Sequence, residues 1–259
     1  MSRIDLNYKR VPHEDKTINS LSIKDFESFN KNIRGLGDIT IDGKYISALS
    51  AFIDLQGFTK FCNQIDSHLV IPEFLSHYCD WIFQEISEPF VESKGEERIK
   101  IWGSLPFFAK YLGDGILFLW NTDISGGVPG MCNIVLNLKT LTNNYKSKFL
   151  SEIKKRVSNP PEILRCGIAR GQIISIGNGQ DYVGSCINLS SRLQKLGPLS
   201  FALSRRGFDE AKSENHTIFK SLLLKKVAIR GIGDEELIYV RKDEYNKLTE
   251  QEKTLFLDI

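Results

Sequence analysis

Apolar and polar positions alternate with two different periods along the chain, and this pattern predicts strands and helices from residue 44 onward. The apolar run over residues 45–53, which contains two serines, predicts a buried strand. Apolar residues spaced three or four apart predict a helix over residues 59–94, interrupted near Ile71-Pro72 because proline removes a backbone donor. Its apolar face consists of Phe74, Leu75, Tyr78, Ile82, Ile86 and Phe90.

The remaining elements follow from the same periods and from glycine and proline at their ends. They are, in chain order, a hairpin of residues 106–112 and 116–120, a loop over 121–130, a helix over 131–157, strands over 164–169 and 173–176 around Gly171, a helix over 183–196, a short strand, a small helix near 206–212, and a hairpin over 222–241. Because hairpins and helices alternate irregularly, we expect an α+β fold with one antiparallel-containing sheet and helices packed on one of its faces.

Three segments of the chain differ in composition. The first 43 residues are polar, with one short predicted helix over residues 23–33, and are interpreted as an N-terminal arm. A folded domain over residues 44–242 and a C-terminal helical tail over residues 243–259 complete the predicted organisation.

Composition and charge narrow the classes of protein that remain. With 41% hydrophobic and 25% charged residues, the 259-residue chain matches an ordinary soluble globular protein. Its formal charge is +2 and its basic residues are scattered, so we expect no nucleic-acid partner. No apolar stretch suits a signal peptide or a membrane span, so we expect a cytoplasmic protein without membrane insertion. The five cysteines are interpreted as free thiols, and the four histidines show no zinc spacing with them.

Two aspartates stand where a carboxylate has little structural reason to be. Asp54 ends the first apolar run, and Asp114 lies between two glycines in the turn of the first hairpin. Each has a simpler alternative interpretation, Asp54 as the cap of the helix that begins near Thr59 and Asp114 as a turn former. An acid at the end of one buried strand and another in a tight turn between two strands is also how a fold holds divalent metal over a polyphosphate.

A second pair of polar residues, Asn188 and Arg192, is spaced four apart in the helix predicted over residues 183–196 and therefore shares one helical face. The core side of this helix is predicted to consist of Val183, Ile187, Leu193 and Leu196. The alternative is a pair that only faces solvent. A guanidinium and a carboxamide on one face can also stabilise charge on a phosphoryl group and orient a sugar.

The segments around these residues resemble the signature segments of the class III nucleotidyl (adenylate/guanylate) cyclase homology domain. They are residues 52–59, 110–115, 166–171 and 184–193. They follow the family's order at comparable separations, and the resemblance covers residues 44–242. It implies an α+β class III cyclase fold with a ferredoxin-like βαββαβ core and an additional hairpin, active as a head-to-tail homodimer.

The resemblance also implies roles for individual residues. Two divalent cations, Mn²⁺ or Mg²⁺, would be held by Asp54, Asp114 and the main-chain carbonyl of Leu55. The triphosphate would contact the backbone amides of Gln56, Gly57, Phe58 and Thr59. The 3′-hydroxyl of the substrate would attack the α-phosphorus and expel pyrophosphate. Asn188 would position the ribose and Arg192 would stabilise the transition state, both from the opposite subunit, so that a monomer would be inactive.

Lys110 and Asp181 align with the positions that read the base in purine cyclases. A lysine donates and an aspartate accepts, and this pair matches the acceptor and donor of adenine or of cytosine. The amino-acid sequence of residues 110–115, 177–184 and 188–196 is similar to that of the pyrimidine cyclases of bacterial Pycsar anti-phage systems. Those enzymes make cyclic CMP or cyclic UMP for a separate effector. The resemblance therefore favours CTP, and UTP next, over the ATP of an ordinary adenylate cyclase.

The chain also departs from the family pattern. Ile232 stands where some relatives place a triphosphate-binding lysine, and Arg230 is a candidate replacement whose simpler interpretation is a surface charge. Two other classes of protein remain as alternatives. A catalytically silent binding or dimerisation module would usually lose a metal acid or the arginine, and a palm-type diguanylate cyclase or polymerase would not call for the helix of Asn188 and Arg192.

Overall fold

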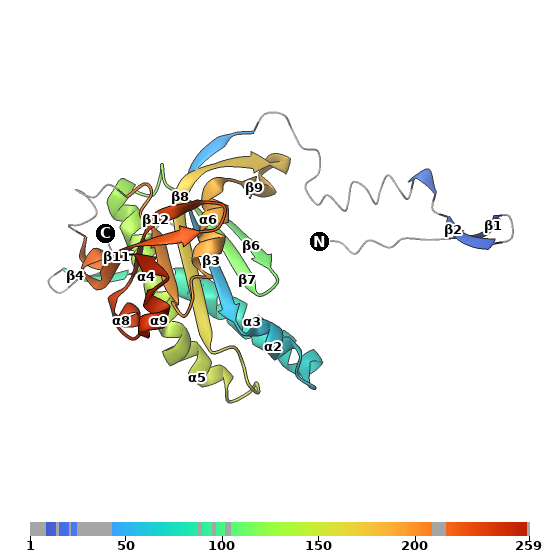
Figure 1. Ribbon diagram of the computed structural model, residues 1–259, viewed down its shortest axis with the longest axis horizontal. Coiled ribbons are helices and arrows are strands. Elements are labelled where there is room, and N and C mark those ends of the chain that lie inside the picture. Colours follow the sequence, from blue (N-terminus) through green and yellow to red (C-terminus); the bar gives the residue numbers. More distant parts are fainter. Residues whose placement is uncertain are drawn as a thin grey trace. The chain divides into compact units, whose positions relative to one another are not determined.

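A computed structural model describes residues 9–13, 16–20, 22–24, 43–87, 90–94, 97–101, 105–208 and 216–257 (Figure 1). The chain divides into two compact units, one of residues 1–45 and 174–183 and a larger one of residues 46–173 and 184–259. The helix predicted over residues 23–33 lies outside the described residues, except for a helical segment at residues 23–24.

Nine strands of the described residues form the main sheet, eight of them in the order β13-β11-β12-β10-β8-β3-β7-β6, with β9 paired to β8. The strands are β3 (Tyr45–Gln56), β6 (Phe108–Leu112), β7 (Gly115–Asn121), β8 (Ile163–Ile176), β9 (Asp181–Val183), β10 (Phe201–Ser204), β11 (Leu222–Ile229), β12 (Gly233–Arg241) and β13 (Phe256–Leu257). Most described pairs are antiparallel, and β10 runs parallel to β8. The predicted hairpins β6–β7 and β11–β12 are confirmed.

Four strands and the two helical regions that connect them make a ferredoxin-like core. The helices that follow β3 are α2 (Phe58–Cys62) and α3 (Ser67–Ser87), and β7 is followed by α4 (Gly127–Asn144), a π-helical turn (Tyr145–Phe149) and α5 (Leu150–Ile153). The chain thus runs β3-α-β6-β7-α-β8, with the strands side by side as β8-β3-β7-β6. This is the predicted βαββαβ arrangement.

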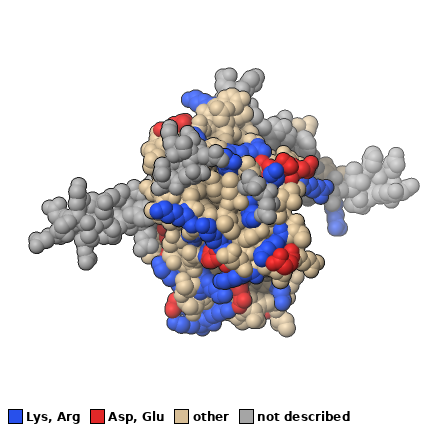
Figure 2. Space-filling model, turned by 60° about the vertical axis from the view of Figure 1, so that its left-hand side comes forward, with Lys and Arg blue, Asp and Glu red and all other residues tan. Residues whose placement is uncertain are grey.

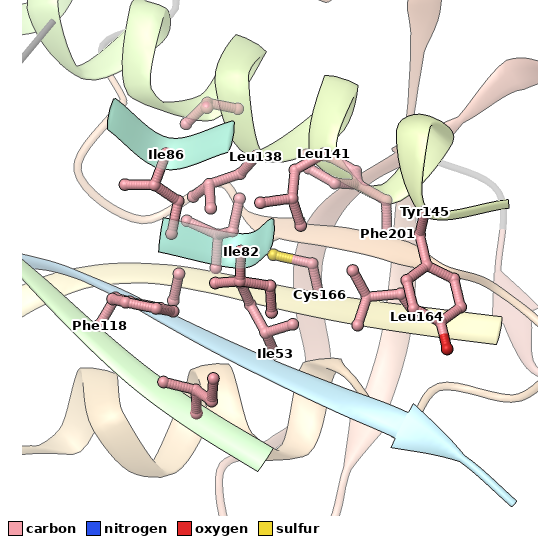
Figure 3. Close-up of a cluster of buried hydrophobic side chains, with 14 of the residues drawn as sticks. Ile53, Ile82, Ile86, Phe118, Leu138, Leu141, Tyr145, Leu164, Cys166 and Phe201 are labelled. Atoms are coloured by element: carbon pink, nitrogen blue, oxygen red, sulfur yellow. The ribbon is translucent and has the colours of Figure 1, made fainter. Parts of the chain in front are cut away.

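The main hydrophobic core lies between the sheet and the helices α3 and α4 (Figure 3). Side chains of the strands, helices and π-helical turn meet there, among them Ile53, Ile82, Ile86, Phe118, Leu138, Leu141, Tyr145, Leu164 and Cys166 (Figure 3). Every second side chain of β3 points into this core, because successive side chains of a strand point to opposite faces of the sheet.

The boundaries of the first helical region differ from the prediction. The break falls between α2 and α3 at residues 63–66, where the Asn63 amide bonds to Lys60 as in a tightened last turn. Pro72 lies inside α3, because losing one backbone donor does not outweigh the burial of Phe74 and the rest of the apolar face. The helix ends at Ser87, and Phe90 belongs to a separate hairpin, β4 (Phe90–Lys94) and β5 (Glu97–Ile101).

The prediction that helices cover one face of the sheet is wrong. Helix α6 (Ser185–Leu193) packs on the other face, where Ser50 of β3 meets Ser190 at 2.8 Å between hydroxyl oxygens. A Cβ on Gly167 of β8 would lie 2.1 Å from the carbonyl oxygen of Ser190. The small residues at positions 50 and 167 therefore let the backbone of α6 approach the sheet closely.

Three other predicted boundaries are corrected. Residues 163–176 form one continuous strand, and Gly171 marks a close approach, since its Cβ would lie 3.0 Å from that of Cys186. Val183 belongs to β9 and is 47% exposed, so it does not serve the core of the predicted helix. The described part of the small helix predicted near 206–212 is a turn, and residues 209–212 lie outside the described residues.

The end of the chain adds two short helices, α8 (Lys242–Tyr245) and α9 (Glu250–Lys253), before β13 pairs with β11. In the smaller unit, β1 (Lys9–His13) and β2 (Lys16–Ser20) form a hairpin that the sequence did not reveal. There the amide of Ser175 also donates to the carbonyl of Lys44 at 3.2 Å.

The distribution of charged residues on the surface and the state of the cysteines agree with what the composition predicts. On the face shown in Figure 2, lysine and arginine are interspersed with acidic and uncharged residues. All five cysteines are free, as predicted. Within the described segments, no helix is both long and apolar enough to cross a membrane.

Candidate active site

Asp54 and Asp114 lie side by side at one end of the sheet. Strand β3 pairs with β7 so that Asp54 is opposite Gly115, the residue after Asp114. Gly113 adopts a φ of +79°, as the tight turn before β7 requires. A Cβ on Gly115 would lie 2.6 Å from a ring carbon of Phe52, so glycine is needed there for β7 to reach β3.

Asp54 does not cap a helix. It lies inside β3, and the residue that precedes α2 is Gly57, with a φ of +86° and no side-chain cap. The alternative interpretation of Asp54 as a helix cap is therefore wrong. Its side chain is on the α6 face of the sheet, because Leu55 and Ile53 alternate with it into the main core.

The electrostatics of the pair favour a bound cation. Burial raises the pKa of the Asp54 carboxyl, and the neighbouring Asp114 carboxylate raises it further, while Arg165 and Lys195 act in the opposite direction. Among the described residues, no donor bonds to either carboxylate. Two unpaired acids that repel each other are the donor set that a hard divalent ion stabilises.

The protein alone supplies few metal ligands. The described residues contain no group of three or more His, Cys, Asp or Glu side chains that could hold a metal. The two carboxylates and the Leu55 carbonyl still fit an oxygen-ligated ion whose remaining ligands come from substrate phosphates or water.

The four residues predicted to contact phosphate lie in the turn after β3. Gln56 ends β3, and Gly57 turns the chain into Phe58 and Thr59, the first residues of α2. Gly57 and Thr59 are exposed, and Gln56 and Phe58 are half-buried. A cavity of about 600 Å³ opens beside this turn, lined in part by Gln56, Gly57 and Lys60.

Arg165 joins the site without having been predicted. It lies on β8, and its Nε donates to Oε1 of Gln56 at 3.1 Å. No described carboxylate forms an ion pair with it, so its remaining guanidinium donors are available beside Asp54. The signal in the sequence is the single charged residue within the apolar strand of residues 163–169.

Asn188 and Arg192 share the exposed face of α6, as predicted. The opposite face is buried and consists of Cys186, Leu189, Ser190 and Leu193. The guanidinium of Arg192 lies against the turn between β11 and β12, where a Cβ on Gly231 would be 2.9 Å from its Nη1. Arg230 in this turn is exposed. No contact recorded for the described residues joins Asn188 or Arg192 to the two acids of the same chain.

The two residues expected to read the base lie in different units. Lys110 is half-buried on β6, in register with Leu117 of β7. Asp181 begins β9 in the smaller unit, where its Oδ1 accepts from the amide of Tyr182 at 2.9 Å. Each is therefore placed within its own unit.

Comparison with known proteins identifies the fold. No protein-family model matches the chain, and the search of curated proteins finds no match. Among solved structures, the adenylyl cyclase CyaB from P. aeruginosa is similar at 14% identity and a TM-score of 0.52, over 81% of this chain and 100% of that one. The guanylyl cyclase Cya2 is similar at 15% identity and a TM-score of 0.47, over 78% and 94%. The likeness to CyaB shows that the chain has the mixed α+β fold of class III cyclase catalytic domains.

Proposed function

We propose that the chain is a nucleotidyl cyclase, which converts a nucleoside triphosphate to its 3′,5′-cyclic mononucleotide and pyrophosphate. The observation that carries the proposal is the unpaired acid pair, Asp54 and Asp114, with Arg165 beside it. The cyclase fold supplies the setting in which such a pair acts on a triphosphate.

The residues present can bind the reacting groups. Asp54, Asp114 and the carbonyl of Leu55 would hold two divalent cations, Mn²⁺ or Mg²⁺. When bound, such cations lower the pKa of a hydroxyl and neutralise a triphosphate. Arg165 and the backbone amides of residues 56–59 would bind the phosphate oxygens. The 3′-oxygen then forms a bond to the α-phosphorus, and the bond from the α-phosphorus to the oxygen that bridges it to the β-phosphate breaks. Pyrophosphate leaves with that oxygen, and the proton of the 3′-hydroxyl passes to solvent.

A homodimer would complete the site. Asn188 and Arg192 are exposed on α6, and no described contact links them to the acids of their own chain. In a head-to-tail dimer, Asn188 would orient the ribose and Arg192 would stabilise the transition state in the partner's site. Arg230, in the turn next to Arg192, is a further candidate phosphate contact.

For the base, we favour CTP, with UTP next. Support comes from the donor and acceptor character of Lys110 and Asp181 and from the resemblance to Pycsar-type pyrimidine cyclases. The cyclic nucleotide would then be a second messenger for a separate effector in anti-phage defence. An ordinary adenylate cyclase making cyclic AMP is the alternative, because adenine presents the same donor and acceptor pair.

A silent binding or dimerisation module is the alternative from another class. It has less support, because Asp54, Asp114, Asn188 and Arg192 are all present.

The deciding experiment incubates the purified protein with Mn²⁺ and each of the four ribonucleoside triphosphates and separates the products. A cyclic pyrimidine nucleotide is expected from the wild type and from Asp123→Asn, a control at an exposed acid, and none from Asp54→Asn. Cyclic AMP alone would contradict the defence assignment. No cyclic product from any triphosphate would contradict the enzyme.

A further inference from the structure

Lys195 is a basic residue near the acid pair, and among the described residues it has no side-chain partner. It follows α6, its amide bonds to the carbonyl of Arg192 at 3.0 Å, and its side chain is exposed. No ion pair or side-chain hydrogen bond joins it to any residue that the structure describes. An unpaired lysine on a surface is ordinary, so its position relative to the acids decides whether it matters.

Backbone contacts bring the end of α6 close to β8 near Arg165. A Cβ on Gly167 would lie 2.5 Å from the amide nitrogen of Gln194, the residue before Lys195. Arg165 is two residues before Gly167 on β8 and therefore points to the same face of the sheet. The helix end carrying Lys195 is thus held over the face that presents Arg165 and Asp54.

The charge of Lys195 reaches Asp54. The charges of Arg165 and Lys195 both act on the Asp54 carboxylate, in the direction opposite to the charge of Asp114. Two acids that can hold cations and two bases with unused donors therefore lie close enough for their charges to interact. Such a set can place metal on one side of a polyanion and ammonium and guanidinium groups on the other.

We propose that Lys195 binds the polyphosphate of a nucleotide held by Asp54 and Asp114 of the same chain, working with Arg165. The inference rests on the proposed function for the identity of the ligand as a triphosphate. Helix α6 would then serve two sites, with Lys195 acting within its own chain and Asn188 with Arg192 acting in the partner's site.

The test uses inorganic tripolyphosphate, which reports on polyphosphate binding without any chemistry. Its dissociation constant is measured by calorimetry with Mn²⁺ for the wild type, Lys195→Met, Lys195→Arg and the control Lys155→Met, at an exposed lysine paired with Glu152. We expect Lys195→Met to weaken binding about tenfold, the size of a charge-assisted contact, and Lys195→Arg to restore most of it. Lys155→Met should match the wild type.

The outcomes separate this inference from the proposed function. Equal tripolyphosphate affinity in Lys195→Met and the wild type, or no binding by the wild type, would overturn the role of Lys195. Tripolyphosphate binding that depends on Lys195, in a protein that makes no cyclic product, would support the inference and contradict the cyclase activity.

Mixed dimers test whether Lys195 acts within its own chain. Chains with Asp114→Ala are mixed with chains with Arg192→Ala, so that the intact site takes its acids from the second chain. Lys195→Met added to the Arg192→Ala chain should raise the KM of the restored activity about tenfold. The same substitution on the Asp114→Ala chain should leave it unchanged, and the reverse pattern would overturn the assignment to the same chain.

Discussion

The hydroxyl of Ser50 on β3 donates a hydrogen bond to the hydroxyl of Ser190 on α6, with 2.8 Å between the oxygens. The direction follows from the second bond of Ser190, whose single proton goes to the carbonyl of Ile187 at 3.0 Å. Both serines are fully buried. This bond joins the strand that carries Asp54 to the helix that carries Arg192.

The direction of the bond predicts an asymmetry between two alanine variants. Ser190→Ala leaves the buried hydroxyl of Ser50 without an acceptor and should lower the free energy of unfolding by about 1–3 kcal/mol. Ser50→Ala removes only a donor to Ser190, which keeps its bond to Ile187, and should cost about 0.5–1 kcal/mol. Urea denaturation of both variants and the double variant measures this. Equal losses, or a larger loss in Ser50→Ala, would contradict the assigned direction.

Repulsion between the acids predicts that Asp54→Asn stabilises the protein without metal. Because the pKa of Asp54 is raised in the fold, by burial and then by Asp114, ionisation at neutral pH costs stability. Stability from this group is present at low pH and is lost as pH rises through the raised pKa. Asn at this position should therefore raise the melting temperature in chelator at pH 7.5, and the gain should shrink as pH falls into the usual aspartate range.

The same variant should lose its response to metal. Wild-type protein should melt at a higher temperature as Mn²⁺ is added, because the cation binds the folded state, and Asp54→Asn should not. Asp123→Asn, at an exposed acid, is the control and should behave as the wild type in both measurements. An Asp54→Asn protein that is less stable than the wild type in chelator would show that the acids do not repel each other.

Much of the fold could be predicted because its signals are local. The β6–β7 turn is visible in two glycines around an acid, and the apolar spacing of α3 is set by its own turns. The face covered by α6 could not be predicted, because it depends on Ser50 and Gly167, which leave room for a backbone that is distant in sequence. The predicted break at Gly171 is absent for a related reason, since this glycine accommodates Cys186 within a continuous strand.

The site was predictable to a different degree for each residue. Asp54, Asp114, Asn188 and Arg192 stand out because polar side chains interrupt a pattern or repeat at helical spacing. Arg165 also interrupts an apolar strand, but its place in the site depends on Gln56, 109 positions away in the chain. Long-range contacts of this kind leave no periodic signal.

The bond between Gln56 and Arg165 predicts a positioning role for Gln56. Gln56→Met keeps the length of the side chain but removes the oxygen that accepts from Arg165, so the guanidinium should lose its fixed orientation. We expect KM for the triphosphate to rise about three- to tenfold, with kcat changed much less, since the loss is one hydrogen bond to a charged group. Gln64→Met, at a glutamine that bonds to Phe61 instead, is the control. A fall in kcat with constant KM would contradict the role.

A site shared between subunits predicts rescue by mixing. Asp114→Ala and Arg192→Ala should each be inactive alone, one lacking a metal ligand and the other the group that stabilises transition-state charge. Mixed dimers contain one site with all its groups, so up to about a quarter of wild-type activity should return when equal amounts exchange subunits at random. Product formation after mixing, compared with each variant alone, measures this. Absence of rescue despite confirmed subunit exchange would place all four groups in one chain.

The contact between Gly231 and Arg192 predicts that the β11–β12 turn positions the guanidinium. Gly231 has a φ of +74°, and an added Cβ would lie 2.9 Å from Nη1 of Arg192. Gly231→Ala should cost about 1–2 kcal/mol of stability from the backbone conformation and should displace the guanidinium. Because a shifted catalytic group loses much of its effect, kcat should fall about tenfold or more, with tripolyphosphate binding unchanged. Gly233→Ala is the matched control, since its Cβ would meet no atom within 4 Å and its φ is not positive. If both variants retained the wild-type kcat, the turn would have no part in placing Arg192, and the close approach at Gly231 would be packing alone.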